Sequence, residues 1–126
     1  MPNHPAELSL HPLVAFSRSE PTVTWSLEHE GEIYKVRVQP RLAMNDYTGV
    51  QRAVLDGHGI SEIPSIVCAQ SLDSGHLVQV MPQWTFAPVT LSAIYPSNRN
   101  LSRLVRLFID LCVERVEALV PNARIA

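Results

Sequence analysis

The sequence predicts an α/β fold, a mixed sheet flanked by helices, and three observations support this class. Segments with a two-residue hydrophobic period alternate along the chain with segments of helical period. Apolar residues make up 46% of the 126 residues and charged residues 17%, which is a globular composition. This length is enough for a modest core, so we expect residues 1–126 to form a single domain.

Strand-like segments dominate the first part of the chain. Residues 12–17 form a short apolar run that predicts a buried strand. Residues 22–39 alternate apolar and polar side chains in two runs, and Gly31 stands between them, which predicts a β-hairpin with a positive φ at that glycine. Pro40 ends the hairpin because proline cannot donate to a ladder, and residues 41–44 predict another short strand.

A helix is predicted next, from Asn45 or Asp46 as its N-cap to about Leu55. Gly57 follows at the position where a helix stops in the left-handed conformation. The pair Gly57 and Gly59 therefore marks a helix end and a turn. It does not predict a phosphate cradle, because such cradles precede a helix N-terminus and do not follow a C-terminus.

The rest of the chain alternates between further strands and helices. The predicted elements are a strand at 59–63, a helix from Pro64 to residue 72, strands at 74–82 and 89–96, and an amphipathic helix from Ser102 to Pro121. The last helix carries leucine, valine and phenylalanine side chains on one broad face.

Charge and motif content argue against several classes of function. The net charge is −2, whereas a nucleic-acid surface needs clustered Lys and Arg. No apolar run is long enough to cross a membrane and no signal sequence is visible, so we expect a cytoplasmic protein without membrane contact. The histidines are scattered and no nucleophile has a base nearby in the sequence, so we expect no metal, no cofactor and no catalytic residue. Cys68 and Cys112 are interpreted as reduced, buried thiols.

Polar residues at three predicted junctions between strands and helices are candidates for a binding site. These junctions are Ser17–Arg18, Asn45–Tyr47 and Glu62–Pro64. Ligands in α/β sheets lie beyond the C-terminal ends of strands, and a helix N-terminus attracts a small carboxylate. A second interpretation stays open, in which Asn45 only caps its helix and Glu62 only faces water.

The segments PRLAMND and VQRAVLDGHGISEIP, between residues 40 and 64, resemble the effector-binding domain of LysR-type transcriptional regulators. Three further segments resemble other parts of that domain in the same order: HPAELSLHPLVAFSR, SGHLVQVMPQW and LSAIYPSNRNLSRLVRLFIDLCVERV. The resemblance extends from about Pro5 to Leu119 and depends on order and spacing, because no single motif is decisive.

The resemblance implies a fold like that of type 2 periplasmic binding proteins, with two α/β lobes and a small-molecule effector, an organic or amino acid, in the cleft. Residues of about 5–96 would form the second lobe, and residues of about 97–120 a long helix returning to the first lobe. The resemblance also implies a homodimer or larger homo-oligomer. DNA would be bound through an N-terminal winged helix-turn-helix, which we expect to lie outside this chain, as do the linker helix and the first lobe.

The resemblance also places a set of residues on the effector-binding wall of the second lobe. They are Ser17, Arg18, Asn45, Asp46, Glu62, Ile63 and Pro64. The family usually has an apolar residue where Glu62 stands, so Glu62 is expected to pair with Arg18 or to bind a cationic group. The apolar face of the last helix would normally pack on the first lobe. We therefore expect this helix to fold back on its own lobe or to dock on another copy of the chain.

Three functions stay open at this point. The chain is either the effector-sensing part of a LysR-type regulator, a stand-alone organic-acid-binding protein or small enzyme, or a dimerisation module without a ligand. A converging acid/base pair would favour an enzyme, and a pocket filled by its own side chains would favour the dimerisation module. The resemblance favours the first function.

Overall fold

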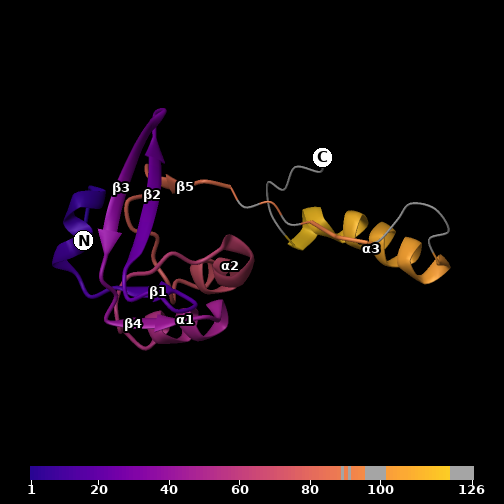
Figure 1. Ribbon diagram of the computed structural model, residues 1–126, viewed down its shortest axis with the longest axis horizontal. Helices are drawn as coiled ribbons and strands as arrows, with labels where there is room; N and C mark the ends of the chain where they lie inside the picture. The colour runs from indigo at the N-terminus through magenta and orange to yellow at the C-terminus, as the bar shows by residue number, and fades with distance from the viewer. Residues whose placement is uncertain (89, 91, 96–101, 120–126) are drawn as a thin grey trace. The chain divides into compact units, whose positions relative to one another are not determined.

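The computed structural model describes residues 1–88, 90, 92–95 and 102–119, and the chain divides into two compact units, Met1–Pro88 and Val89–Ala126. Figure 1 labels their helices and strands. The first unit contains the 3₁₀ helix η1 (Pro5–Leu10), β1 (Val14–Phe16), β2 (Val23–His29), β3 (Glu32–Val38), β4 (Leu42–Met44), α1 (Tyr47–Leu55), α2 (Ser65–Asp73) and β5 (Thr85–Phe86). The second unit contains α3 (Arg103–Leu119).

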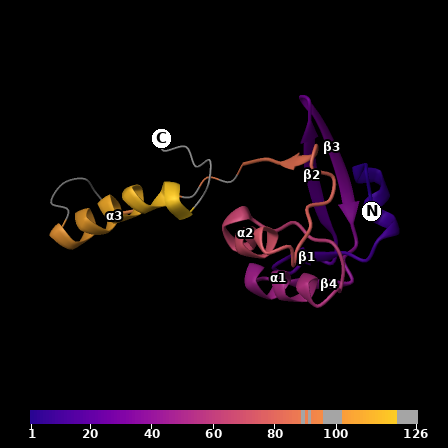
Figure 2. The ribbon, with the colours of Figure 1, turned by 180° about the vertical axis from the view of Figure 1, so that it is seen from behind.

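The strands of the first unit form two sheets, one parallel and one antiparallel, as a mixed α/β fold predicts. Strands β1 and β4 are parallel, with Phe16 opposite Met44. Strand β2 is antiparallel to β3 on one side and to β5 on the other. In Figures 1 and 2 the β2–β3 hairpin extends away from β1 and β4, which lie beside α1.

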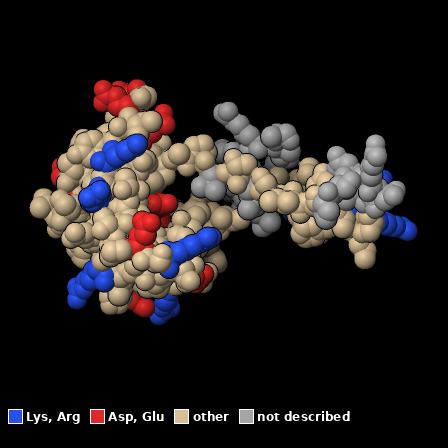
Figure 3. All heavy atoms as spheres, viewed as in Figure 1, with Lys and Arg blue, Asp and Glu red and all other residues tan. Residues whose placement is uncertain are grey.

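The β2–β3 hairpin follows the predicted alternation. Glu30 and Gly31 form its two-residue turn, and both have positive φ values (50° and 85°), as a type I′ turn requires. The side chains of Trp25, Leu27 and Val38 are buried on one face. Exposed acidic side chains gather at the tip of the hairpin in Figure 3 and belong to Glu28, Glu30 and Glu32. This tip is a solvated acidic surface.

Helix α1 begins and ends where local chemistry predicts. The Asp46 carboxylate accepts a hydrogen bond from the backbone N–H of Gly49 at 2.8 Å, so Asp46 is the N-cap. Gly57 has a φ of +81° just beyond the helix, the conformation that a glycine stop uses. Gly59 passes so close to Pro12 that a Cβ would collide with the Pro12 carbonyl oxygen, so only glycine fits there.

Two hydrophobic clusters stabilise the first unit, and β1 contributes to both. Leu13 and Ala15 face one cluster while Val14 faces the other, as the alternation of side chains along a strand requires. The buried residues of the first cluster are Leu8, Leu13, Ala15, Trp25, Leu27, Val38 and Met81. Those of the second cluster are Val14, Val50 and Ala53. Both faces of β1 are therefore covered.

The predicted strand at 59–63 is reduced to one residue pair. Ile60 forms a single parallel bridge with Leu13. Beyond it the ladder does not continue, and residues 61–64 have no regular secondary structure. The segment nevertheless runs parallel to β1 at this bridge.

The prediction of a buried strand at 74–82 is wrong. The backbone N–H of Leu77 bonds to a carbonyl oxygen of α2, and Val78 is 68% exposed. Apolar alternation alone does not form a strand when the backbone has no ladder partner. Of the predicted strand at 89–96, residues 90 and 92–95 have no regular secondary structure, and the other residues lie outside the described part of the chain.

Two elements of the first unit, η1 and β5, have no counterpart in the sequence prediction. Helix η1 is capped by the His4 side chain, whose Nδ1 accepts a hydrogen bond from the Ala6 N–H at 3.1 Å. It buries Leu8 in the first cluster. The ring centroids of His4 and Trp84 lie 5.2 Å apart, which ties η1 to the segment just before β5. Such contacts between distant residues leave no local pattern in the sequence.

Helix α3 begins as predicted. The Ser102 hydroxyl oxygen accepts a hydrogen bond from the Val105 N–H at 3.3 Å, so Ser102 caps the helix. Leu104 is 79% exposed and Phe108 is 61% exposed, and the expected docking of this face stays a prediction. The predicted end at Pro121 lies outside the described residues. Among the helices described, none combines the length and the apolar composition that a membrane span requires.

The two cysteines lie in different surroundings. Cys68 on α2 is free and buried, as predicted, and burial raises the pKa of its thiol because the thiolate is disfavoured away from water. Cys112 on α3 is free but exposed, so the prediction of a second buried thiol is wrong. Helical spacing gives the face on which a residue lies, but it does not determine whether that face is covered.

Candidate functional site

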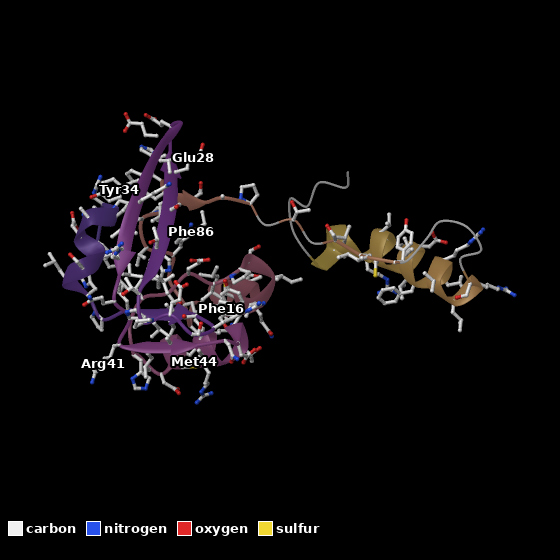
Figure 4. The ribbon with its side chains drawn as sticks, viewed as in Figure 1. Phe16, Glu28, Tyr34, Arg41, Met44 and Phe86 are labelled. Carbon is white, nitrogen blue, oxygen red and sulfur yellow. The ribbon has the colours of Figure 1, made fainter. Side chains whose placement is uncertain are left out.

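Three chain segments run parallel and end on the same edge of the first unit. Strand β1 is the middle one: the Ser17 N–H donates to the Met44 carbonyl oxygen at 2.8 Å, and the Val14 N–H donates to the Ile60 carbonyl oxygen at 2.9 Å on the opposite edge of the strand. Figure 4 labels Phe16 and Met44 where β1 and β4 end. The three predicted junctions therefore follow neighbouring segments at one edge, the place where α/β folds bind ligands.

A hollow of about 240 Å³ lies beside the end of β1. Its lining residues are Phe16, Ser17, Arg18, Ser19, Glu20 and Val23. The Ser17 hydroxyl donates to the Glu20 carbonyl oxygen at 2.8 Å and accepts from the Glu20 N–H at 3.0 Å, so it closes this loop. Arg18 is exposed and has no ion-pair partner within the described residues, so its guanidinium is available to a ligand.

The start of α1 is already occupied by a carboxylate. Asp46 caps the helix through the Gly49 N–H, which places a negative charge at the positive end of the helix dipole. A ligand carboxylate would be repelled there. Asn45, one residue earlier, is exposed, so its amide is available as a donor and an acceptor.

An aromatic and acidic cluster joins the three junctions. The rings of Phe16 and Tyr47 are stacked, with centroids 4.4 Å apart and planes inclined by 17°. The Tyr47 hydroxyl donates to Oε1 of Glu62 at 3.5 Å, which is long for a hydrogen bond. Phe16 also lines the hollow. The carboxylate of Glu62 is thus connected to the hollow through two ring systems.

The Glu62 carboxylate is partly buried and only weakly compensated. Burial raises the pKa of Glu62 because desolvation disfavours the charged form, and the Tyr47 hydroxyl offsets a smaller part of this shift. The pKa of Tyr47 is raised as well, first by burial and then by the nearby charge of Glu62. Arg18 does not lie within ion-pair distance of Glu62, so the expected Arg18–Glu62 pair is not formed.

Two of the predicted wall residues, Ile63 and Pro64, have no polar side-chain group. Ile63 packs against the second hydrophobic cluster, and its carbonyl oxygen accepts a weak hydrogen bond from the Cys68 thiol at 3.7 Å. Pro64 occupies the N-cap position of α2 and makes no side-chain cap bond. Both present only apolar atoms and a backbone carbonyl, so the polar side chains of the predicted wall belong to the other junction residues.

Phe16 and Tyr47 are the residues that the predicted wall does not include. Phe16 falls in the predicted buried strand at 12–17, and Tyr47 is the last residue of the predicted Asn45–Tyr47 junction. Their positions in the sequence could have indicated them, since Phe16 comes directly before the polar pair Ser17–Arg18 and Tyr47 directly after Asn45–Asp46. Their stacking brings together residues far apart in the chain, and no local pattern predicts such a contact.

Parallel strand ends beside a hollow lined by polar and aromatic side chains are typical of α/β lobes that bind small molecules. Within the described residues, no three His, Cys, Asp or Glu side chains come together in a way that could hold a metal ion. The class defined by this geometry is an α/β small-molecule-binding lobe. The chain belongs, within this class, to the family of the LysR substrate binding domain, whose family profile matches residues 1–117.

Two curated relatives illustrate the similarity. The chain is 34% identical over 106 residues to the HTH-type transcriptional regulator PtxR of Pseudomonas aeruginosa, an alignment that covers 84% of this chain and 34% of PtxR. It is 30% identical over 122 residues to the HTH-type transcriptional regulator DmlR of Escherichia coli, covering 96% of this chain and 39% of DmlR. The chain thus spans little more than a third of the length of these relatives.

Two solved structures that resemble this chain support its place in this family. The full-length structure of the Vibrio cholerae virulence activator AphB, a member of the LTTR protein family, matches 90% of this chain and 38% of its own, with a TM-score of 0.77 and 29% identity. The regulatory domain of AphB from Vibrio vulnificus matches 90% of this chain and 57% of its own, with a TM-score of 0.69 and 27% identity. The predicted fold class and the predicted family are both confirmed.

Proposed function

We propose that this chain is the part of a LysR-type regulator that senses a small-molecule effector, an organic or amino acid, and that it binds without catalysing a reaction and without a cofactor. Residues of about 5–96 form the second lobe, and residues of about 97–120 return to a first lobe. The effector-binding wall consists of Ser17, Arg18, Asn45, Asp46, Glu62, Ile63 and Pro64. In the whole protein, effector binding controls DNA binding by a winged helix-turn-helix, and the regulator works as a cytoplasmic homo-oligomer.

The observation that carries this proposal is the convergence of the three junctions at one edge of the first unit, beside the hollow at the end of β1. The hollow opens to solvent, so Arg18 in its lining is accessible to a ligand. Arg18 and Asn45 are exposed beside this edge and supply the charge and the amide that an organic acid requires.

Amide NMR spectra of the chain, titrated with organic acids and amino acids, test the proposal. We expect at least one compound to shift amide signals of residues 17–20, 44–47 and 61–64 together. The Arg18→Ala variant should weaken the binding of a carboxylate compound about tenfold, because it removes a charge-assisted hydrogen bond. Arg37→Ala, at an exposed position of β3, is the matched control and should leave binding unchanged. Shifts confined to the β2–β3 hairpin would contradict the assignment of the wall.

A further inference from the structure

The carboxylate of Glu62 is an unusual group for the wall of a site that binds a simple anion. It is partly buried, and its hydrogen-bond partner is the neutral hydroxyl of Tyr47 at 3.5 Å. A carboxylate removed from water is stabilised by a cation or by several hydrogen bonds. Within the described residues Glu62 has no ion-pair partner, so its negative charge remains available to a positively charged group from outside the chain.

The aromatic rings beside Glu62 suit such a group. Phe16 and Tyr47 stack with ring centroids 4.4 Å apart, and Phe16 is also part of the hollow. Stacking covers the inner face of each ring and leaves the outer faces. An outer ring face attracts an ammonium ion through its quadrupole, and the carboxylate at the edge of the same aromatic pair adds direct charge pairing. Two independent features of the site, the rings and the acid, therefore favour the same ligand chemistry.

The start of α1 disfavours an anionic ligand group. Asp46 holds its negative charge at the helix N-terminus, where an anionic ligand group would otherwise be attracted. Arg18, in the loop that lines the hollow, is the cation that the wall offers to a carboxylate. The wall thus presents the positive charge of Arg18, in the loop after β1, and the negative charge of Glu62, in the segment after Ile60.

From this arrangement, and resting on the proposed effector-binding function, we infer that Glu62, with the rings of Phe16 and Tyr47, selects effectors that carry an ammonium group. The effector is accordingly an amine or an amino acid, with its ammonium at Glu62. A simple organic acid without an amine is disfavoured, because it would leave the charge of Glu62 unpaired or place a second anion beside it.

Matched pairs of compounds with and without the amine test this inference. Amide NMR titrations of the chain use phenylalanine with hydrocinnamate, leucine with isocaproate and glutamate with glutarate, and putrescine is added as an amine without a carboxylate. The amine member of a binding pair should bind about tenfold tighter or more, the value of a hydrogen bond between charged groups. The affinity for the amine should fall as the pH is lowered through the pKa of Glu62, because protonation removes the charge that attracts it.

Two variants separate this role from a structural one. Glu62→Gln should abolish the preference for the amine, while Glu32→Gln, at the exposed tip of the hairpin, should retain it. Tyr47→Phe keeps the aromatic ring and leaves the Glu62 carboxylate in place, so this variant should also retain the preference for the amine. Equal binding of the amine and its partner, or an unchanged preference in Glu62→Gln, would overturn the inference and leave the proposed function standing. If no compound of either kind perturbs the wall, the proposed function fails together with the inference.

Discussion

Helices α1 and α3 carry the same kind of sequence pattern and lie in different surroundings. Both have an apolar stripe opposite polar residues and a capping side chain at the N-terminus. In α1 the stripe is covered, with Val50 0% exposed and Ala53 6% exposed. In α3 the corresponding side chains are open, with Leu104 79% exposed and Phe108 61% exposed. An apolar stripe therefore predicts a helix and its inward face, but the partner of that face depends on other parts of the chain.

The partner of α1 lies in the same unit, although it is distant in the sequence. Val14 of β1, which is fully buried, packs against Val50 and Ala53, and the parallel pair β1–β4 presents this surface to the helix. In the second unit, the described residues outside α3 form no strand that could play this part. The expectation that α3 docks on its own lobe or on another copy of the chain would supply the missing partner.

The largest expected effect compares the same truncation in the two helices. Val50→Ala should lower the free energy of unfolding by about 2 kcal/mol or more, because it leaves a cavity in a closed cluster. Val113→Ala on α3, where the side chain is 47% exposed, should lower it by less than about 0.5 kcal/mol. Urea denaturation of both variants measures the difference. Equal losses would break the contrast and would mean that α3 buries its stripe in solution.

A smaller effect compares the two helix caps. Asp46→Ala should lower the free energy of unfolding by about 1 kcal/mol, because it leaves the Gly49 N–H without its acceptor. Asp46→Asn keeps an acceptor and is the matched control, with a loss of about half that size or less. Ser102→Ala should reduce the helical circular dichroism of α3 and leave the urea midpoint of the first unit unchanged. A shift of that midpoint by Ser102→Ala would show that the two units unfold together.

The parts of the fold that the sequence predicts correctly depend on local chemistry. The turn at Gly31, the stop at Gly57 and the Asp46 cap each follow from the conformation or hydrogen bonds of a few adjacent residues. The strand predicted at 74–82 fails because a strand also needs a partner edge, which no local pattern contains. The 3₁₀ helix η1 is missed for the same reason, since it is held by contacts with distant residues.

The candidate site likewise has features that the sequence predicts and features that it does not. Its junction residues are predictable because strand ends and helix starts are marked in the sequence, and parallel strands bring their ends together. The contact of Tyr47 with Glu62 and the stacking on Phe16 are not predictable, since they depend on how side chains from separate segments pack. The expected pair of Arg18 with Glu62 fails because opposite charges at neighbouring junctions do not by themselves ensure that the side chains reach each other.

The smallest expected effect on stability comes from removing a carboxylate charge, at Glu62 beside α1 or at Glu114 on the surface of α3. Burial raises the pKa of Glu62, so the folded state binds this proton more tightly than the unfolded state. The raised pKa of Glu62 therefore contributes stability that is fully present below the ordinary glutamate pKa. This contribution is lost as the pH rises through the folded-state pKa of Glu62. Glu62→Gln carries no charge, so at neutral pH it should be more stable than the parent chain, by less than about 1 kcal/mol because water still screens a partly exposed group.

Thermal unfolding of Glu62→Gln across this pH range measures the effect, and its advantage should disappear in acid. The matched control is Glu114→Gln, at an exposed position of α3, which should change stability by only about a few tenths of a kcal/mol at any pH. A loss of stability in Glu62→Gln at neutral pH would mean that the ionised carboxylate has a favourable partner in the free protein. In that case the charge of Glu62 is already compensated, and Glu62 is not available to a ligand ammonium group.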